Sequence, residues 1–252
     1  MNQNSLAGLR GMLAVENTRW TKSYNWFKNS LIWLLLVNGM ITLTLSQSSL
    51  LGLNPTASTG LDLLFQLFGG MCPVGAIILV HGSIISEREN GTLAWVLSMP
   101  VARRSVILSK LAVNILYSST IIIFLQGLVA QVIIQYFSGE TISLIPYYAG
   151  VAQVALYIAI WVSFSIMLGV LLRGRTTVMS AALGTLFFHG TVAGLLARVL
   201  PFAPRLMPSQ VLSSAVSTVM GGGGSLEAIL VALWWIGCFI LVSIFNFEKE
   251  EL

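Results

Sequence analysis

Charged side chains are scarce in this chain of 252 residues: 9% are charged and 56% are hydrophobic. Soluble domains carry about 25% charged residues, so the composition excludes an ordinary soluble domain. A helix needs about 20 apolar residues to cross a bilayer, and six runs reach that length without the alternation typical of barrel strands. We therefore expect an all-α membrane protein, one transmembrane domain over residues 1–252. Its spans should cover about 31–51, 61–85, 106–136, 144–172, 176–200 and 226–245.

Catalytic motifs and clusters of metal ligands are also missing. The chain has no His-Glu-x-x-His, no Gly-x-Ser-x-Gly and no Gly-x-x-x-x-Gly-Lys-Ser/Thr phosphate loop, which excludes the enzyme classes that these motifs define. Cys72 and Cys238 lie inside apolar runs, where packing is the expected role. His81 and His189 stand singly, so hydrogen bonding or cavity lining fits them better than catalysis. We expect no catalytic residue, no metal site and no enzyme activity on this chain.

An amphipathic pattern precedes the first apolar run. Over residues 6–28, leucine and aromatic side chains recur at three-, four- and seven-residue steps, with Arg10, Arg19, Lys22 and Lys28 largely between them. This spacing predicts a helix. Its basic and aromatic sides suit a helix lying among the lipid headgroups of the cytoplasmic leaflet. The alternative is a solvated helix that packs on a soluble partner.

The basic residues also predict how the spans are oriented. With both termini in the cytoplasm, eleven of the 13 lysines and arginines fall on inner segments, as the positive-inside rule requires. The other two, Arg198 and Arg205, fall at or beyond the outer end of the fifth span. We therefore expect a multi-pass protein of the cell membrane that contacts membrane lipids, and we expect no nucleic acid as a partner.

Several amide side chains lie within the predicted spans. An amide in hydrocarbon needs either a hydrogen-bond partner or a water-filled path, so two interpretations stay open: bonds between helices, or the lining of a translocation path. The near absence of charge in the middle of the spans favours an amphipathic or apolar cargo over a strongly ionic one. The candidates for the translocation path are Asn38, Gln66, Asn114, Gln126 and Gln131.

The fifth span is rich in small residues. Ser180, Gly184, Gly190 and Gly194 include a Gly-x-x-x-Gly pair, and such spacing lets two helix backbones approach closely. This pattern predicts a helix or subunit interface. The following segment, 201–225, ends in four glycines that cannot hold a helix. The part before them is either a short helix that dips back into the bilayer or a surface loop.

Between the second and third runs lies a short segment of mixed character. We expect the second span to continue as a helix through Glu87, Arg88 and Glu89, and to stop at Asn90-Gly91. Thr92 is a suitable N-cap for a short helix over 93–98, which ends because the residue before Pro100 disfavours helix. This short helix is too apolar for water, so it requires a protein groove or the membrane interface.

The order of these residues carries a resemblance. Glu87-Arg88-Glu89-Asn90-Gly91-Thr92, followed by Leu93, Leu97, Ser98, Pro100, Arg104 and Lys110, resembles the Glu-Arg-Glu-x-Gly-Thr signature of ABC-2 type transporter permeases. The resemblance implies a permease subunit of an ATP-driven exporter, paired with a second permease and with two ABC ATP-binding subunits that hold ATP and Mg²⁺.

The resemblance also implies that residues 93–98 form a cytoplasmic coupling helix seated in the ATP-binding subunit. The implied coupling residues are Glu87, Arg88, Glu89, Gly91, Thr92, Leu93, Trp95, Val96, Leu97, Pro100, Arg103 and Arg104. An ATP-independent channel or secondary transporter is the alternative. It would have no ATPase partner and would usually show a repeat between its two halves.

Overall fold

A computed structural model describes residues 8–98 and 101–249, and every regular element in those ranges is helical. This confirms the all-α prediction. Six helical segments are long and apolar enough to cross a membrane: Asn25–Leu50, Ala57–Glu89, Arg103–Ser138, Leu144–Leu171, Arg175–Val199 and Leu226–Lys249. The number of spans is therefore as predicted.

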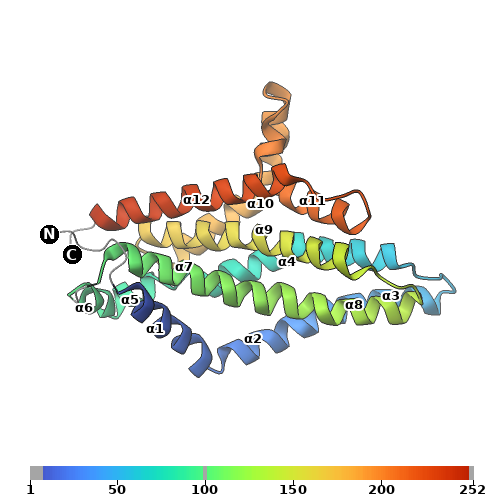
Figure 1. Ribbon diagram of the computed structural model, residues 1–252, viewed down its shortest axis with the longest axis horizontal. Coiled ribbons are helices and arrows are strands. Elements are labelled where there is room, and N and C mark those ends of the chain that lie inside the picture. The colour runs from blue at the N-terminus through green and yellow to red at the C-terminus, as the bar shows by residue number, and fades with distance from the viewer. Residues whose placement is uncertain (1–7, 99–100, 250–252) are drawn as a thin grey trace.

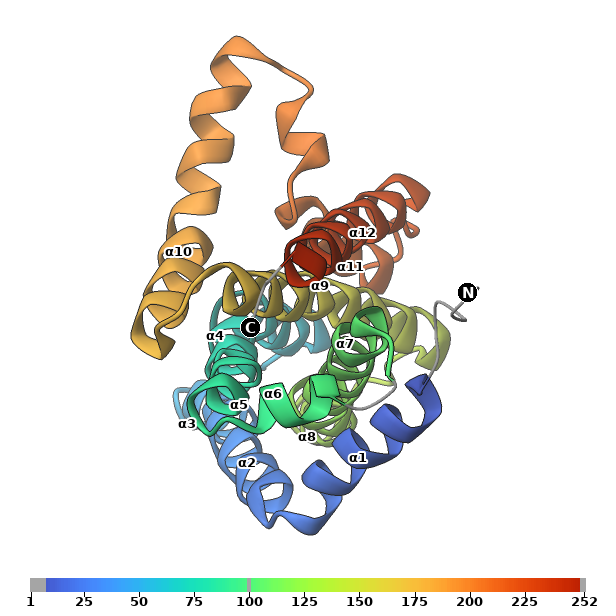
Figure 2. The ribbon, with the colours of Figure 1, turned by 90° about the vertical axis from the view of Figure 1, so that its left-hand side faces the viewer.

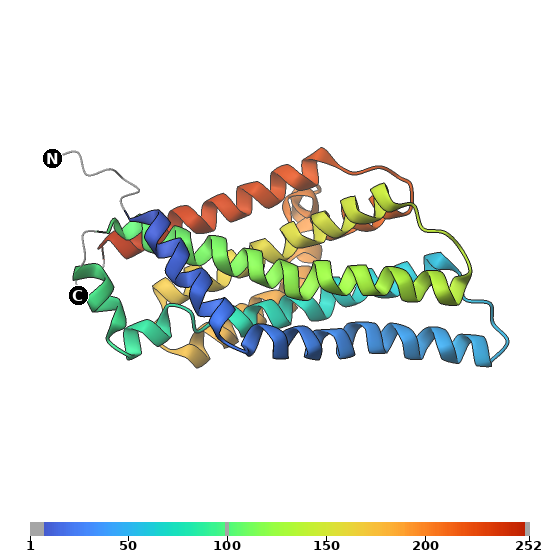
Figure 3. The ribbon, with the colours of Figure 1, turned by 60° about the horizontal axis from the view of Figure 1, so that its bottom comes forward.

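The spans form an elongated bundle. The described part of the chain begins and finishes at the same end, together with the short helices α5 (Ile85–Glu89) and α6 (Thr92–Ser98) (Figures 1 and 3). We call this the α6 end. At the opposite end, left-handed glycines terminate helices α3 (Gly39–Leu50) and α8 (Leu125–Ser138): Gly52 has φ +73° and Gly139 has φ +68°. Glycine tolerates this conformation because it has no Cβ.

Helix α9 (Leu144–Leu171) is the core of the bundle. In the most apolar stretch of 18 residues of α9, 72% of the residues are buried. The corresponding share is 22% in α10 (Arg175–Val199) and in α12 (Leu226–Lys249). Tyr147 and Tyr157 are among its fully buried side chains. Burial of such large apolar surfaces is worth about 1.5–3 kcal/mol per side chain in water-soluble cores, and in lipid the close packing itself takes over that role.

The N-terminal segment differs from the prediction of one helix over 6–28. Helix α1 (Leu9–Lys22) ends where Ser23 adopts an extended conformation, with φ −85° and ψ 131°. A second helix, α2 (Asn25–Trp33), then runs through the π-helical turn η1 (Leu34–Asn38) into α3. The first span therefore begins at Asn25 rather than near Leu31, because its first polar turn belongs to the spanning helix.

The second span also differs in one respect. Helix α4 (Ala57–Val80) begins at the N-cap Thr56, whose hydroxyl accepts a hydrogen bond from the Thr59 amide at 3.3 Å. It does not continue into residues 85–89 as predicted, since turns at residues 81–84 separate it from α5. Gly82 and Ser83 lie in this break, and both are weak helix formers. Pro73 lies inside α4 without interrupting it.

The third span comprises α7 (Arg103–Ser119), the π-helical turn η2 (Thr120–Phe124) and α8. After α10, the segment 201–225 contains the short 3₁₀ turn η3 (Ala203–Leu206) and helix α11 (Ser209–Val219), which packs along α9. A short helix, rather than a loop, thus precedes the glycines. The C-terminal part of α10 projects away from the bundle, and η3 returns the chain toward α12 (Figure 2).

Candidate functional site

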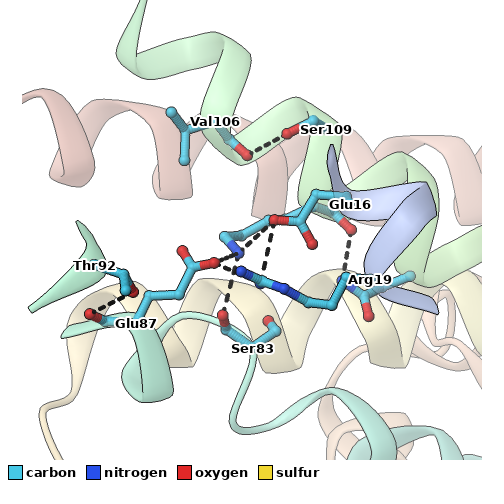
Figure 4. A network of polar contacts seen from close by, with 9 residues as sticks. Glu16, Arg19, Ser83, Glu87, Thr92, Val106 and Ser109 are labelled. Carbon is cyan, nitrogen blue, oxygen red and sulfur yellow. Dashed lines mark hydrogen bonds and ion pairs between the residues drawn. The ribbon is translucent and has the colours of Figure 1, made fainter. Parts of the chain in front are cut away.

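A cluster of buried charges lies near the α6 end. The Lys110 side chain on α7 is fully buried, and its Nζ lies 2.8 Å from Glu16 Oε1 on α1 and 2.8 Å from Glu87 Oε1 on α5. The same ammonium donates a hydrogen bond to the Ser83 carbonyl at 3.3 Å. Figure 4 shows the Glu16 and Glu87 carboxylates close to each other and to Arg19, with dashed lines that mark the polar contacts among them. One lysine therefore joins α1, α5 and the break after α4.

Arg19 completes the cluster from the solvent side. Its Nη1 lies 2.5 Å from Glu87 Oε1 and 3.5 Å from Glu16 Oε1, and its side chain is half exposed. Burial by itself would lower the pKa of Arg19, but the hydrogen bond that Arg19 donates to Glu87 and the charges of Glu16 and Glu87 outweigh burial and raise that pKa. The cluster contains two acids and two bases, so its formal charges cancel.

Arg88 points away from this cluster toward the end of α9. Its Nη1 donates to the carbonyls of Gly169 at 3.4 Å and Leu172 at 3.3 Å, and its Nη2 donates to the Val170 carbonyl at 3.4 Å. The last carbonyls of a helix have no partner within the helix. A cation at this position also interacts favourably with the helix dipole, whose negative end lies there. Arg88 therefore binds the α5 segment to the end of the core helix.

Glu89 and Thr92 extend these contacts. Glu89 Oε2 lies 2.7 Å from Arg175 Nη2 at the start of α10. The Thr92 hydroxyl donates to the Glu87 carbonyl at 3.2 Å, which ties the first residue of α6 to α5. Gly91, between them, has φ +69° and makes the sharp turn. Successive residues of α5 thus bind different helices, and α6 is attached directly to this group.

Arg103 and Arg104 join the base of α7 to the end of α12. Arg103 Nη1 donates to the Glu248 carbonyl at 2.9 Å, and Arg104 Nε lies 2.5 Å from Glu248 Oε1. The resemblance implied that both arginines are coupling residues, and in the structure they bind the end of α12. Both contacts lie at the α6 end of the bundle.

Helix α6 itself is short and partly exposed. The Trp95 side chain is 65% exposed, whereas Val96 is partly buried and packs against the core. The side chains of Leu93 and Leu97, and all of Pro100, lie outside the described residues. An exposed tryptophan on a helix of this kind is a typical anchor for a protein interface.

Residues 34–252 match the sequence profile of the ABC-2 family transporter proteins. The chain belongs to the ABC-2 family. It is also 23% identical over 251 residues to the probable ABC transporter permease protein NosY of Stutzerimonas stutzeri, a match that covers 88% of this chain and 91% of that protein. The resemblance inferred from the Glu-Arg-Glu-x-Gly-Thr sequence is confirmed, and in this ABC-2 chain the three charged residues of that sequence hold helices together.

The amides proposed to line a path do not all converge. Asn38 and Gln126 are buried and hydrogen-bonded to each other at 2.9 Å. Gln131 accepts a hydrogen bond from the Tyr148 hydroxyl at 2.8 Å, and Asn114 donates to the Lys110 carbonyl at 2.7 Å. Gln66 is exposed. The structure brings Asn38 and Gln126 together and gives most of these amides helix partners; a role in translocation stays a prediction.

The small residues of α10 have few neighbours within the chain. Ser180, Gly190 and Gly194 are exposed, and a Cβ added at Gly184, Gly190 or Gly194 would meet no atom within 4 Å. No helix of the described chain therefore approaches α10 along these glycines. The predicted interface, where it forms, must be with another molecule.

Sequence reasoning did not identify Glu16 and Lys110 as partners of the Glu-Arg-Glu sequence. One signal was available: Glu16 is the only acidic residue before Asp62, and Lys110 lies within the third apolar run. A lysine inside such a run requires a carboxylate partner. The distance in sequence between the two residues concealed their pairing.

Proposed function

We propose that this chain is the permease subunit of an ATP-driven exporter, and that α6 docks on a separate ABC ATP-binding subunit. In this proposal the α6 end and both termini face the cytoplasm, and the protein resides in the cell membrane. ATP and Mg²⁺ bind the partner. The observation that carries the proposal is the set of contacts from Glu87, Arg88 and Glu89, because it connects one exposed helix with four others.

The contacts suggest how movement of α6 would spread. Thr92 joins α6 to Glu87, and Glu87 binds Lys110 on α7 and Arg19 on α1. Arg88 and Glu89 connect the same segment to α9 and α10. A force applied to α6 would therefore reach spans 3, 4 and 5 through direct polar contacts. ATP would drive transport by favouring one arrangement of the bundle over the other.

An apolar pocket supports an apolar or amphipathic cargo. It has a volume of about 520 Å³, and α9, α10, residues 207–208 and α12 line it. His189 and Thr185 are the polar side chains of its lining, and five residues contribute large aromatic rings: Trp161, Phe164, Phe188, Trp235 and Phe239. Apolar pockets of 300–1,000 Å³ with a few polar groups are typical small-molecule sites. The charged residues that are buried, Glu16, Glu87 and Lys110, all lie at the α6 end.

The subunit arrangement follows from the family and from α10. We propose two permeases with two ATP-binding subunits, and we place Gly190 and Gly194 at the contact between the permeases. Their lack of neighbours within the chain supports this placement, since small residues on a span permit close helix pairing.

The docking role of α6 is tested by co-purification. Trp95→Asp should abolish capture of the co-expressed ATP-binding subunit, because a charge replaces an exposed aromatic anchor. Leu53→Asp is the matched control: Leu53 is 62% exposed but lies at the opposite end of the bundle, so capture should persist. Retention of the ATP-binding subunit by Trp95→Asp would show that α6 is not the docking element. Transport by the permease without any ATPase would instead support a channel or secondary transporter.

A further inference from the structure

Two spans contain a π-helical turn. Residues 34–38 of span 1 form η1, and residues 120–124 of span 3 form η2. In η2 the Leu125 amide bonds to the Thr120 carbonyl, five residues back. Such wide turns are rare and occur frequently at functional sites. They mark the points at which these two helices depart from regular geometry.

A single amide pair connects the two turns. Asn38, the last residue of η1, donates from Nδ2 to Gln126 Oε1 at 2.9 Å, and Gln126 Nε2 donates to the Ile121 carbonyl in η2 at 2.9 Å. Asn38 is 3% exposed and Gln126 is fully buried. Gln126 thus bonds simultaneously to span 1 and to the irregular turn of its own span.

Span 2 contributes contacts to both turns. The Cys72 Sγ lies 3.9 Å from the Ile122 carbonyl of η2. Trp33, directly before η1, packs so closely on Gly75 that an added Cβ would lie 1.8 Å from its ring. Pro73 lies between these two contacts and lacks the amide hydrogen of a regular helix. We call residues 33–38, 72–75 and 120–126 the pivot layer.

The amide pair is only partly satisfied. Asn38 Oδ1 is buried and has no hydrogen-bond partner among the described residues. A buried acceptor without a donor raises the free energy of the conformation that contains it. An arrangement of spans 1 and 3 that brings a donor to Asn38 Oδ1 would satisfy this acceptor. In contrast, α9 runs as one α-helix from Leu144 to Leu171.

From this convergence we infer that spans 1, 2 and 3 bend at the pivot layer while α9 stays straight, and that Asn38 and Gln126 are positioning residues that make spans 1 and 3 bend together. The inference rests on the proposed function for its link to ATP. The α6-end halves of these spans carry α1, α5 and the Lys110 contacts, so bending at the layer would let them follow α6 while the opposite halves stay in place.

The first test needs only the permease. Spin labels at Ile32 and Leu116, both exposed, report the distance between the α6-end halves of spans 1 and 3, and labels at Leu43 and Val132 report the opposite halves. Cys238→Ala removes the partly exposed native thiol, and Cys72 is buried. We expect Asn38→Leu with Gln126→Leu to broaden the 32–116 distances and leave the 43–132 distances unchanged. The exchanged pair, Asn38→Gln with Gln126→Asn, should restore the narrow distribution. Identical distributions in all three proteins would overturn the inference.

The second test adds the ATP-binding subunit. With ATP and a hydrolysis-deficient partner, the distance from Leu116 to Leu171 on α9 should shift, while that from Val132 to Ala152 on α9 should not. Equal shifts of both pairs would mean that span 3 tilts rigidly, which overturns the inference but leaves the proposed function standing. No shift in either pair, with the complex intact, would overturn the proposed coupling to ATP and the pivot's role in it.

Discussion

Lys110 illustrates why a buried charge must be considered with all its neighbours. Its ammonium is shared by Glu16 and Glu87, and Arg19 balances the second carboxylate. Taking each charge out of water costs several kcal/mol, and the cluster recovers this only while all four groups are present. Such a cluster contributes little net stability, but it fixes which residues of α1, α5 and α7 meet.

The first prediction concerns this lysine. Lys110→Met should lower the free energy of unfolding by about 3–5 kcal/mol, because it leaves a buried carboxylate uncompensated. The loss is measured by heating the detergent-solubilised protein to a series of temperatures and using size-exclusion chromatography to quantify the fraction that stays folded. Adding Glu87→Gln to Lys110→Met should recover part of it, since Glu16 and Arg19 then balance each other.

Arg104→Ala serves as the surface comparison for that experiment. Arg104 and Glu248 are 51% and 37% exposed, and an exposed ion pair contributes little to stability because water screens it. A loss from Arg104→Ala as large as that from Lys110→Met would contradict the distinction between the buried and exposed pairs. Equal losses from the single and double variants would show that the uncompensated charge is not the cause.

At the scale of helices, substitutions at two glycines should affect the stability of the chain differently. A Cβ at Gly150 on α9 would lie 2.3 Å from a Val219 methyl and 2.9 Å from the Ala215 backbone oxygen of α11. Gly150→Ala should therefore separate α9 from α11 and cost about 1–3 kcal/mol. Thermal stability of the purified chain measures this cost; unchanged stability would mean that α11 does not sit so closely on α9.

Gly190→Leu should leave the stability of the single chain unchanged and should instead weaken the contact between permeases. No atom lies within 4 Å of its added Cβ, so the stability of the single chain should be unchanged. If α10 forms the permease contact, the bulkier residue should shift the protein from dimer to monomer. Multi-angle light scattering in detergent measures the mass, and Gly11→Leu on α1, where the added Cβ also meets no atom within 4 Å, is the control. A dimer that survives the change would place the contact elsewhere.

The spans were predictable because each depends on local composition. An apolar run long enough for a bilayer and the turn at Gly91 each depend on residues that are neighbours in the sequence. The ends of the first two spans were not predicted correctly, since polar residues such as Asn25 belong to a spanning helix and Gly82 interrupts another. The Glu87–Lys110 and Asn38–Gln126 pairs depend on how helices far apart in sequence are placed side by side, which no local pattern specifies.

For the whole molecule, the described part of the chain begins and finishes at the same end of the bundle as α6 (Figure 1). This arrangement predicts which positions an impermeant thiol reagent reaches in intact cells. In the Cys238→Ala background, Leu53→Cys should react from outside, and Trp95→Cys should react only after the cells are lysed. Both side chains are exposed, at 62% and 65%, so accessibility alone does not separate them. Labelling of Trp95→Cys in intact cells would reverse the proposed orientation.

The central position of α9 also has a consequence for how the protein is made. Spans 1 to 3 leave the ribosome before α9, and their inner faces, including Phe65 on α4 and Ile107 on α7, stay buried only when the bundle is complete. Until residue 171 has been inserted, α9 cannot cover the parts of α4 and α7 that it contacts in the complete bundle. During that interval the Arg88 guanidinium cannot yet donate hydrogen bonds to the carbonyls at the end of α9. Insertion of the fourth span thus adds the helix that packs on both α4 and α7.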